Sequence, residues 1–299
     1  MARIDAGFGE AVFLACTGAS RSALLIDGAG HTVLSPEQLD RCDVVCWNRG
    51  GTMRAAWVAL DAPGAAAMIL GHSMSSDGVP PEVTTNALRW LVDRGSTRGV
   101  RLFEILLETR AGGTARTGAL VAAGFRRLTQ LVYLQGPVAA PHVAGAASLT
   151  WRSYSLDAED DFLKALESSY LQSLDCPELT GLRSTAEALA GHRAAGPFDP
   201  GLWWVARRDG APVGVLLGSR LPDLPAVEIV YLGVAQPARG TGVADALMAR
   251  AARLARSESA NMLTLAVDVR NAPALRLYAR WGLCEYQRRD AWIATPHQT

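Results

Sequence analysis

The sequence is almost without lysine and carries no net charge. Lys164 is the only lysine in 299 residues, and 29 basic residues balance 29 acidic ones. Because no strong overall field would attract a polyanion, this balance argues against nucleic acid or an anionic membrane as a partner. The preference for arginine over lysine is typical of GC-rich coding and indicates no function. A small or locally recognised substrate fits the composition better.

Paired cysteines and long apolar runs are missing as well. The 5 cysteines include no CxxC pair and no histidine partner at metal-ligand spacing, so we expect neither disulfides nor a metal site. No apolar run approaches the ~20 residues that span a bilayer. Asp5 and Glu10 precede the short run AVFLAC, which is not typical of a signal peptide. We therefore expect a cytoplasmic protein that does not interact with membranes.

Length and apolar content predict two domains. The chain has 299 residues, of which 49% are hydrophobic, enough for a buried core in each half. Residues 135–148, QGPVAAPHVAGAAS, are poor in charge and rich in small residues and proline, which is typical of a linker. We place the boundary near residue 145, with one domain at 1–145 and the other at 146–299.

The second half alternates strands and helices. Residues 202–219 are typical of two strands around an Asp209-Gly210 turn. Apolar periodicity and capping residues predict the rest: a strand at 226–234, a helix at 241–256, a strand at 262–269, a helix at 272–281 and two short strands near 283–287 and 290–294. Three antiparallel strands followed by a β-α-β unit are therefore expected.

The first half repeats this ending more faintly. Residues 117–134 share the layout of residues 274–293, which is a helix, a glycine stop and then paired strands. Residues 54–71 match the earlier hairpin, with Pro63-Gly64 in its turn. We infer a tandem duplication.

A glycine turn before the helix at 241–256 indicates a phosphate site. Its sequence is Arg239-Gly240-Thr241-Gly242-Val243-Ala244. Glycine costs a helix roughly 0.5–1 kcal/mol relative to alanine, so two in an opening turn suggest that a ligand approaches the backbone. Amides at the positive end of a helix dipole bind phosphate. A tight turn with close helix packing is the alternative, and a dinucleotide-binding fingerprint fits less well because three antiparallel strands come first.

These residues resemble the signature of the GNAT N-acetyltransferase superfamily, in which Arg or Gln is followed by two residues, Gly, one residue and then Gly or Ala. Arg239, Gly242 and Ala244 match it. NAPALRLYARWGL at 271–283 resembles the second superfamily motif, with Leu283 where phenylalanine is usual. In length and layout the chain resembles tandem acetyltransferases of the mycothiol synthase type. The resemblance implies an α/β fold of two tandem domains, each a mostly antiparallel twisted sheet flanked by helices, with a degenerate N-terminal copy.

The resemblance also implies where acetyl-CoA would bind. In the superfamily the glycine turn, here Arg239, Gly240, Thr241, Gly242, Val243 and Ala244, holds the pyrophosphate. The strand before the turn bulges and separates from the next strand, so backbone groups hold the pantetheine arm and the acetyl carbonyl. Leu232, Gly233 and Val234 would supply them. Asn271 matches an asparagine that contacts the pantetheine side, and a role as an ordinary helix N-cap is equally well supported.

The resemblance implies one base and one acid. An alkylammonium has a pKa near ~10, so an amine must lose a proton before it attacks. Glu228 occupies a position where several superfamily members keep a catalytic glutamate, and burial between apolar neighbours would raise its pKa. Tyr278 matches the tyrosine that protonates the CoA thiolate, and it lies two turns beyond Asn271. A salt bridge for Glu228 and a packing role for Tyr278 are the alternatives.

The first half lacks these groups. Leu120 stands in the place of Tyr278, Gly113 stands in the place of Asn271, and Pro80-Pro81 offers a phosphate no amides. We predict an acetyl-CoA-dependent N-acetyltransferase that acts directly on an amine of a small molecule or peptide, with one acetyl-CoA per chain. A non-catalytic acyl-CoA-binding or scaffold protein and an acyltransferase for a longer acyl chain are the alternatives. The sequence indicates no acceptor.

Overall fold

The structure, a computed structural model, describes residues 3–4, 13–14, 42–49, 52–73, 79–108, 114–138 and 149–296. Its contacts divide the chain into two units. One unit comprises Met1–Arg127 and Ala291–Thr299, and the other comprises Leu128–Asp290. Residues 128–138, which the sequence placed in the first domain, thus belong to the second unit. The boundary expected near residue 145 lies outside the described residues.

The second unit is built on a mixed sheet with the strand order β13-β7-β12-β11-β10-β9-β8. The strands are β7 (Arg126–Pro137), β8 (Thr150–Ser153), β9 (Trp203–Arg208), β10 (Ala211–Arg220), β11 (Ala226–Val234), β12 (Met262–Asp268) and β13 (Cys284–Ala294). β8 to β11 pair antiparallel in turn, as do β12 and β7, whereas β11 and β12 are parallel. This confirms the predicted hairpin at Asp209-Gly210 and the β-α-β unit.

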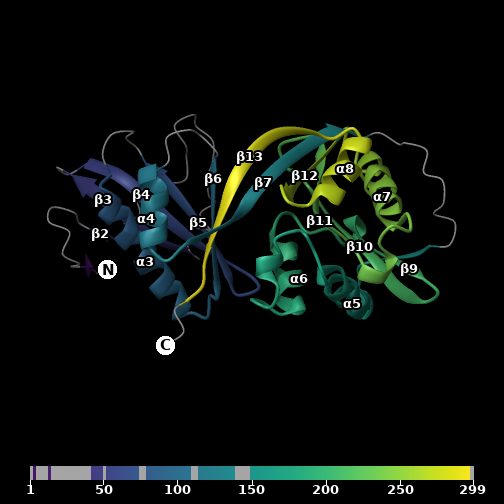
Figure 1. The fold of residues 1–299 in the computed structure, drawn as a ribbon, viewed down its shortest axis with the longest axis horizontal. Coiled ribbons are helices and arrows are strands. Elements are labelled where there is room, and N and C mark those ends of the chain that lie inside the picture. The colour runs from purple at the N-terminus through teal and green to yellow at the C-terminus, as the bar shows by residue number, and fades with distance from the viewer. Residues whose placement is uncertain are drawn as a thin grey trace. The chain divides into compact units, whose positions relative to one another are not determined.

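Helices cover both faces of this sheet (Figure 1). They are α5 (Glu159–Tyr170), α6 (Thr185–Ala194), α7 (Val243–Ser257) and α8 (Ala272–Arg280). α7 and α8 bury Leu247 and Leu277 in one apolar cluster with strands β7, β11 and β12. α5 buries Phe162 and Leu166 in a second cluster, against Trp203 of β9 and neighbouring strands. The sheet is therefore held between two separate cores.

The parallel strands β11 and β12 separate soon after they begin to pair. Their pairing covers only Ala226–Glu228 with Met262–Thr264, although β11 continues to Val234 and β12 to Asp268. β11 also bulges at Val230, because Leu217 of β10 pairs with Tyr231 while the next residue, Gly218, pairs with Ile229. A bulge bends its strand and disturbs the ladder. The backbone of β11 beyond the bulge thus lacks a strand partner on its β12 side.

The first unit repeats this topology. Its sheet has the order β3-β4-β5-β6, followed by β13. The elements are β3 (Cys42–Arg49), β4 (Thr52–Ala62), β5 (Ala66–Ser73), α3 (Pro81–Ser96), β6 (Leu102–Glu108) and α4 (Thr114–Ala122), with β1 (Arg3–Ile4) and β2 (Phe13–Leu14) in a separate pair. β5 and β6 are parallel and pair over only Ala66–Met68 and Leu102–Glu104. The same separation of two parallel strands therefore occurs twice.

Each unit is completed by a strand from the other half of the sequence. β7 follows the first-half helix α4 but pairs with β12, and the end of β13 places Trp292 and Ala294 in the core of the first unit. Two expectations are corrected here. The paired short strands predicted near 283–294 form the single strand β13, and residues 135–137 of the predicted linker belong to β7.

Truncation of Trp292 tests this exchange. We expect Trp292→Ala to destabilise the first unit by about 3 to 5 kcal/mol, because a buried indole leaves a cavity. Its indole Nε1 has no hydrogen-bond partner, so no bond is lost. Hydrogen exchange of the intact variant should show that the mutation accelerates the opening of α3 more than the opening of α7. Cys284→Ala, at an exposed position of the same strand, should change neither rate. Faster opening of α7 alone would contradict the assignment.

Candidate acyl-transfer site

The turn before α7 presents unpaired amides. Within the part of the chain that the structure describes, no backbone carbonyl accepts from the amides of residues 240 to 245, and the first helical donor is the Ala246 amide, to Gly242 O at 3.1 Å. Gly240 and Gly242 have φ of +77° and +84°, with open space where a side chain would stand. This combination of left-handed glycines, free amides and a helix N-terminus suits an anion such as a phosphate.

The Arg239 side chain braces this turn against α5. Its guanidinium donates to the carbonyls of Ser169, Leu171 and Gln172 at 2.9, 2.7 and 3.1 Å. These carbonyls belong to the last turn of α5 and the residues after it, which otherwise have no helical partner. The side chain of Arg239 is thus committed to protein carbonyls, and a phosphate contact through it stays a prediction.

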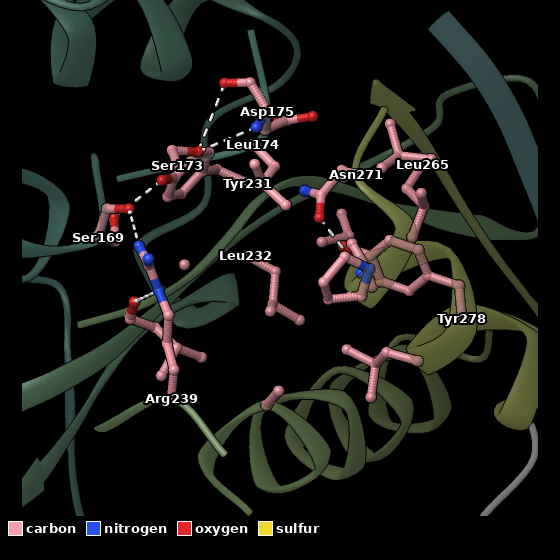
Figure 2. A pocket seen from close by; sticks show the side chains of 18 of the residues that line it. Ser169, Ser173, Leu174, Asp175, Tyr231, Leu232, Arg239, Leu265, Asn271 and Tyr278 are labelled. Carbon is pink, nitrogen blue, oxygen red and sulfur yellow. Dashed lines mark hydrogen bonds between the residues drawn. The ribbon is translucent and has the colours of Figure 1, made fainter. Parts of the chain in front are cut away.

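A cavity of about 560 Å³ occupies the gap between the separated strands. Figure 2 shows residues from β11, α8 and the loop after α5 around it, with Tyr231 and Leu232 near its centre. Backbone of residues 229–234 forms one wall, and residues 265–267 of β12 contribute to another. All of its lining residues belong to the second unit, so one unit supplies the whole cavity.

Most of the predicted site residues line this cavity. They are Leu232, Gly233, Val234, Arg239, Gly240, Gly242, Ala244, Asn271 and Tyr278. Three do not. Val243 is 1% exposed in the core under α7. The Thr241 hydroxyl donates to Ala238 O at 2.7 Å and accepts from Arg208. Glu228 is the third, and it lies on β11 before the cavity begins.

Glu228 marks the point at which the strands part. It pairs with Thr264 in the last parallel pair and with Ser219 of β10. The side chain is half-buried, and burial alone raises its pKa. No ion pair involves Glu228 among the described residues, so the salt bridge considered as its alternative role is not formed there. A carboxylate at this fork with a raised pKa suits proton transfer.

Tyr278 and Asn271 lie on the α8 side of the cavity (Figure 2). Burial raises the pKa of the Tyr278 hydroxyl well above its usual range, with a further contribution from the charge of Asp175. The hydroxyl therefore stays protonated at neutral pH. The Asn271 side chain accepts from the Ala274 amide at 3.3 Å, which is the N-cap geometry. Because it also lines the cavity, its capping role and a ligand contact are compatible.

A polar network beside Asn271 was not found from the sequence. Asp268, at the end of β12, is fully buried and accepts hydrogen bonds from Thr129, from the Cys176 amide and from Arg270. Arg270 also binds Glu178 through both guanidinium nitrogens. The Asp268 amide donates to Asp175 at 2.9 Å. No sequence signal links these residues, because 93 positions separate the last two.

A second cluster of buried polar side chains, Ser169, His192 and Tyr231, lies between α5, α6 and β11. The Tyr231 hydroxyl is 2.8 Å from Ser169 Oγ, and the His192 ring stands 5.0 Å from the Tyr231 ring. Burial lowers the pKa of His192 to about 4, with a contribution from Arg183, so the ring is neutral at pH 7. A side chain at Gly233 would meet Ser169 Oγ at 2.6 Å. Gly233 was predicted to contact the ligand through its backbone. Packing against Ser169 also requires glycine at this position.

The comparisons with known proteins agree with this geometry. A profile of the Acetyltransferase (GNAT) family matches residues 169–283, which span the cavity. The mycothiol acetyltransferase of Acidothermus cellulolyticus is 31% identical over 253 residues, covering 76% of this chain and 75% of that protein. The chain belongs to the GNAT acetyltransferase family. The resemblance and the expected N-acetyltransferase class are thereby confirmed.

Solved structures place the fold in the same family. A GCN5-related N-acetyltransferase from Sphaerobacter thermophilus superposes with a TM-score of 0.62 at 17% identity, covering 93% of this chain and 91% of that one. A tandem GNAT protein from the clavulanic acid biosynthesis pathway gives 0.54 at 16% identity, covering 86% and 84%. At such identities the likeness concerns the fold, and it confirms two tandem GNAT domains.

The described ranges contain neither a metal-ligand cluster nor a membrane-spanning helix. No group of three or more His, Cys, Asp or Glu side chains there could hold a metal ion. None of the helices that the structure describes combines the length and the apolar character needed to cross a bilayer.

We predict that the ionised carboxylate of Asp268 stabilises the fold around the site. Burial pushes its pKa up, but hydrogen bonds from Arg270, Thr129 and the Cys176 amide hold it below its usual range. We expect Asp268→Asn to cost about 3 to 5 kcal/mol at pH 7, because it leaves Arg270 partly unpaired. The ionised form stabilises the fold above ~pH 4 and loses this effect as pH falls through the lowered pKa.

Urea denaturation of both proteins between pH 7 and pH 3 measures this. The difference in unfolding free energy should shrink toward acid, and Asp223→Asn, at an exposed position with no ion pair to any described residue, should show no difference. A difference in unfolding free energy between Asp268→Asn and the parent that does not change with pH would contradict the role of the ionised carboxylate.

Proposed function

We propose that the protein transfers the acetyl group of acetyl-CoA directly to the amine of a small molecule. The supporting observation is the cavity between β11 and β12, which combines free amides at a helix N-terminus, an unpaired strand and a protonated tyrosine. The relatives named mycothiol acetyltransferase support a small-molecule acceptor. A peptide amine is the second candidate for the acceptor, and amines tested in parallel would separate the two.

The residues present fit acetyl-CoA. The amides of residues 240 to 245 would hold its pyrophosphate, since left-handed glycines leave room for close approach. Backbone of Leu232, Gly233 and Val234 would hold the pantetheine arm along β11, with Asn271 on the opposite wall. Bound acetyl-CoA supplies an activated acyl group with a thiolate leaving group.

Glu228 and Tyr278 would act as base and acid. Burial gives Glu228 a raised pKa, which brings it closer to the pH at which it must accept a proton. Tyr278 keeps its proton at neutral pH and lines the cavity, so it can donate to a developing thiolate. A protein that only binds acyl-CoA needs neither group. Release of free CoA thiol with an amine therefore separates catalysis from binding.

We further propose that each chain binds one acetyl-CoA. The first unit has the same separation of parallel strands, β5 from β6. Its helix α3, however, begins with Pro80 as N-cap and Pro81 in the first turn, and neither can donate an amide. Leu120, in the place of Tyr278, is buried in the core of the unit. The first domain would then act as a degenerate copy.

Acetyl-CoA affinity tests the glycine turn. Gly242→Glu puts a carboxylate where the pyrophosphate should bind, and like charges in contact cost several kcal/mol, so we expect at least a 100-fold weaker Kd by calorimetry. Gly210→Glu is the matched control. Gly210 also has positive φ and open space, but it lies in the hairpin turn and does not line the cavity. Equal affinity in a folded Gly242→Glu protein would refute the assignment.

Steady-state kinetics test the base and the acid. We expect Glu228→Gln to lower kcat/KM about 100-fold or more, because the variant cannot accept a proton from the acceptor nitrogen. Tyr278→Phe should lower kcat with the Kd of acetyl-CoA nearly unchanged, because only leaving-group protonation is lost. Tyr154→Phe removes a hydroxyl from the α5–α6 core, away from the cavity, and should leave kcat within about twofold. Full activity of Glu228→Gln or of Tyr278→Phe would exclude the substituted residue from the mechanism.

A further inference from the structure

The cavity is lined by a carboxylate that neither sequence motif contains. Asp175 lies on the loop between α5 and the short helix Pro177–Leu179. In Figure 2, Asp175 stands across from Asn271, with Tyr278 on the same side as Asn271 and Arg239 at the far end of the view. Asp175 is thus placed on the loop wall of the cavity, apart from the phosphate turn.

Its carboxylate is held in a fixed orientation. Oδ1 accepts from the Asp268 amide at 2.9 Å, and the Asn271 side chain lowers the pKa of the carboxyl. The Asp175 amide donates to Ser173 Oγ at 3.1 Å. The Cys176 amide bonds to Asp268 and Arg270 bonds to Glu178, which fixes the loop on both sides of Asp175. These bonds hold the carboxylate in place without a cation.

The Asp175 carboxylate has no positively charged partner in the described part of the cavity. No ion pair involves Asp175 among the described residues, and Arg270, whose charge lowers the pKa of Asp175, is bound to Asp268 and Glu178. Of the arginines that line the cavity, Arg239 binds carbonyls and Arg280 binds Asp245, whereas Arg276 is exposed on α8 and does not act on Asp175. A carboxylate withdrawn from water is costly without an opposite charge. A ligand that brings an ammonium group would supply it.

We propose that Asp175 binds the acceptor amine in its ammonium form and accepts the first of the two protons that the nitrogen must lose. This rests on the proposed acetyl transfer. The carboxylate becomes a carboxylic acid and the ammonium becomes a free amine. The nitrogen lone pair forms the C–N bond, the C–S bond breaks with its electron pair on sulfur, and Tyr278 gives that sulfur a proton. Glu228, which lies on β11 just before the cavity begins, takes the second nitrogen proton through a water, and the net release to water is one proton.

The surroundings of Asp175 suit this step. Burial raises its pKa, the charge of Asp268 adds to that, and the Asp268 amide, Asn271 and Arg270 oppose it. The other titratable groups near it are Cys176, Tyr231 and Tyr278, and burial raises the pKa of each. All three are therefore neutral at pH 7. A carboxylate with a raised pKa is a better match for accepting a proton from an amine than an ordinary aspartate.

The test is Asp175→Asn against Glu178→Gln in the full chain. Ethylamine, cysteamine, glucosamine and lysine serve as probe amines, and kcat/KM is measured with acetyl-CoA from pH 6 to pH 10. With the best probe we expect Asp175→Asn to lower kcat/KM about 100-fold at pH 7, with the Kd of acetyl-CoA unchanged. The deficit should shrink about tenfold per pH unit toward the pKa of the amine, because the variant depends on free amine. Calorimetry with CoA-loaded protein should show weaker amine binding.

Glu178→Gln weakens the same loop without removing the cavity carboxylate, so any loss of kcat/KM that it causes should be the same at every pH. Activity of Asp175→Asn within threefold of the parent, or an equal loss in both variants that does not change with pH, overturns the role of Asp175 and leaves the proposed function intact. A parent protein that binds acetyl-CoA but transfers to no probe, or that does not bind it, overturns both.

Discussion

The structure of the site depends on the separation of β11 from β12 after three residue pairs. Parallel strands normally continue their ladder, and an unpaired strand in a protein interior would leave buried amides and carbonyls unsatisfied. Here the gap is a cavity, and residues 229–234 face it from β11. The bulge at Val230 bends β11, which accounts physically for the divergence. The unpaired backbone thus lines the cavity.

Two polar braces hold the gap open. Arg239 fixes the glycine turn to the end of α5 through three carbonyls. Asp268 and Arg270 fix the loop after α5 to the end of β12 through charge-assisted hydrogen bonds, which are stronger than neutral ones. Both braces end on the same segment, residues 169–178. That segment therefore carries the contacts of the turn at one end and the cavity carboxylate Asp175 at the other.

The duplication repeats the scaffold of the sheet in both units. β5 and β6 diverge as β11 and β12 do. The start of α3 differs from the start of α7, because Pro80 and Pro81 have no amide hydrogen to donate. Each unit also takes its last strand from the other half, through β7 and β13. Neither half of the sequence contains the complete sheet of its own unit, which gives a structural reason for retaining both copies.

The sequence by itself determined the local elements and the two motifs. Periodicity and caps predicted β11 at its observed bounds, α7 and α8 to within a few residues, and the Asn271 cap, because these depend on neighbours within about four positions. Only the tertiary structure decided that β7 and β13 exchange between units, that Glu228 lies at the fork with no arginine partner in the described part of the chain, and that Arg239 binds carbonyls. It also brought Asp175 to Asp268 and Asn271, across 93 positions in the first case. Contacts at such separations depend on how whole elements pack, and no local pattern of side chains encodes them.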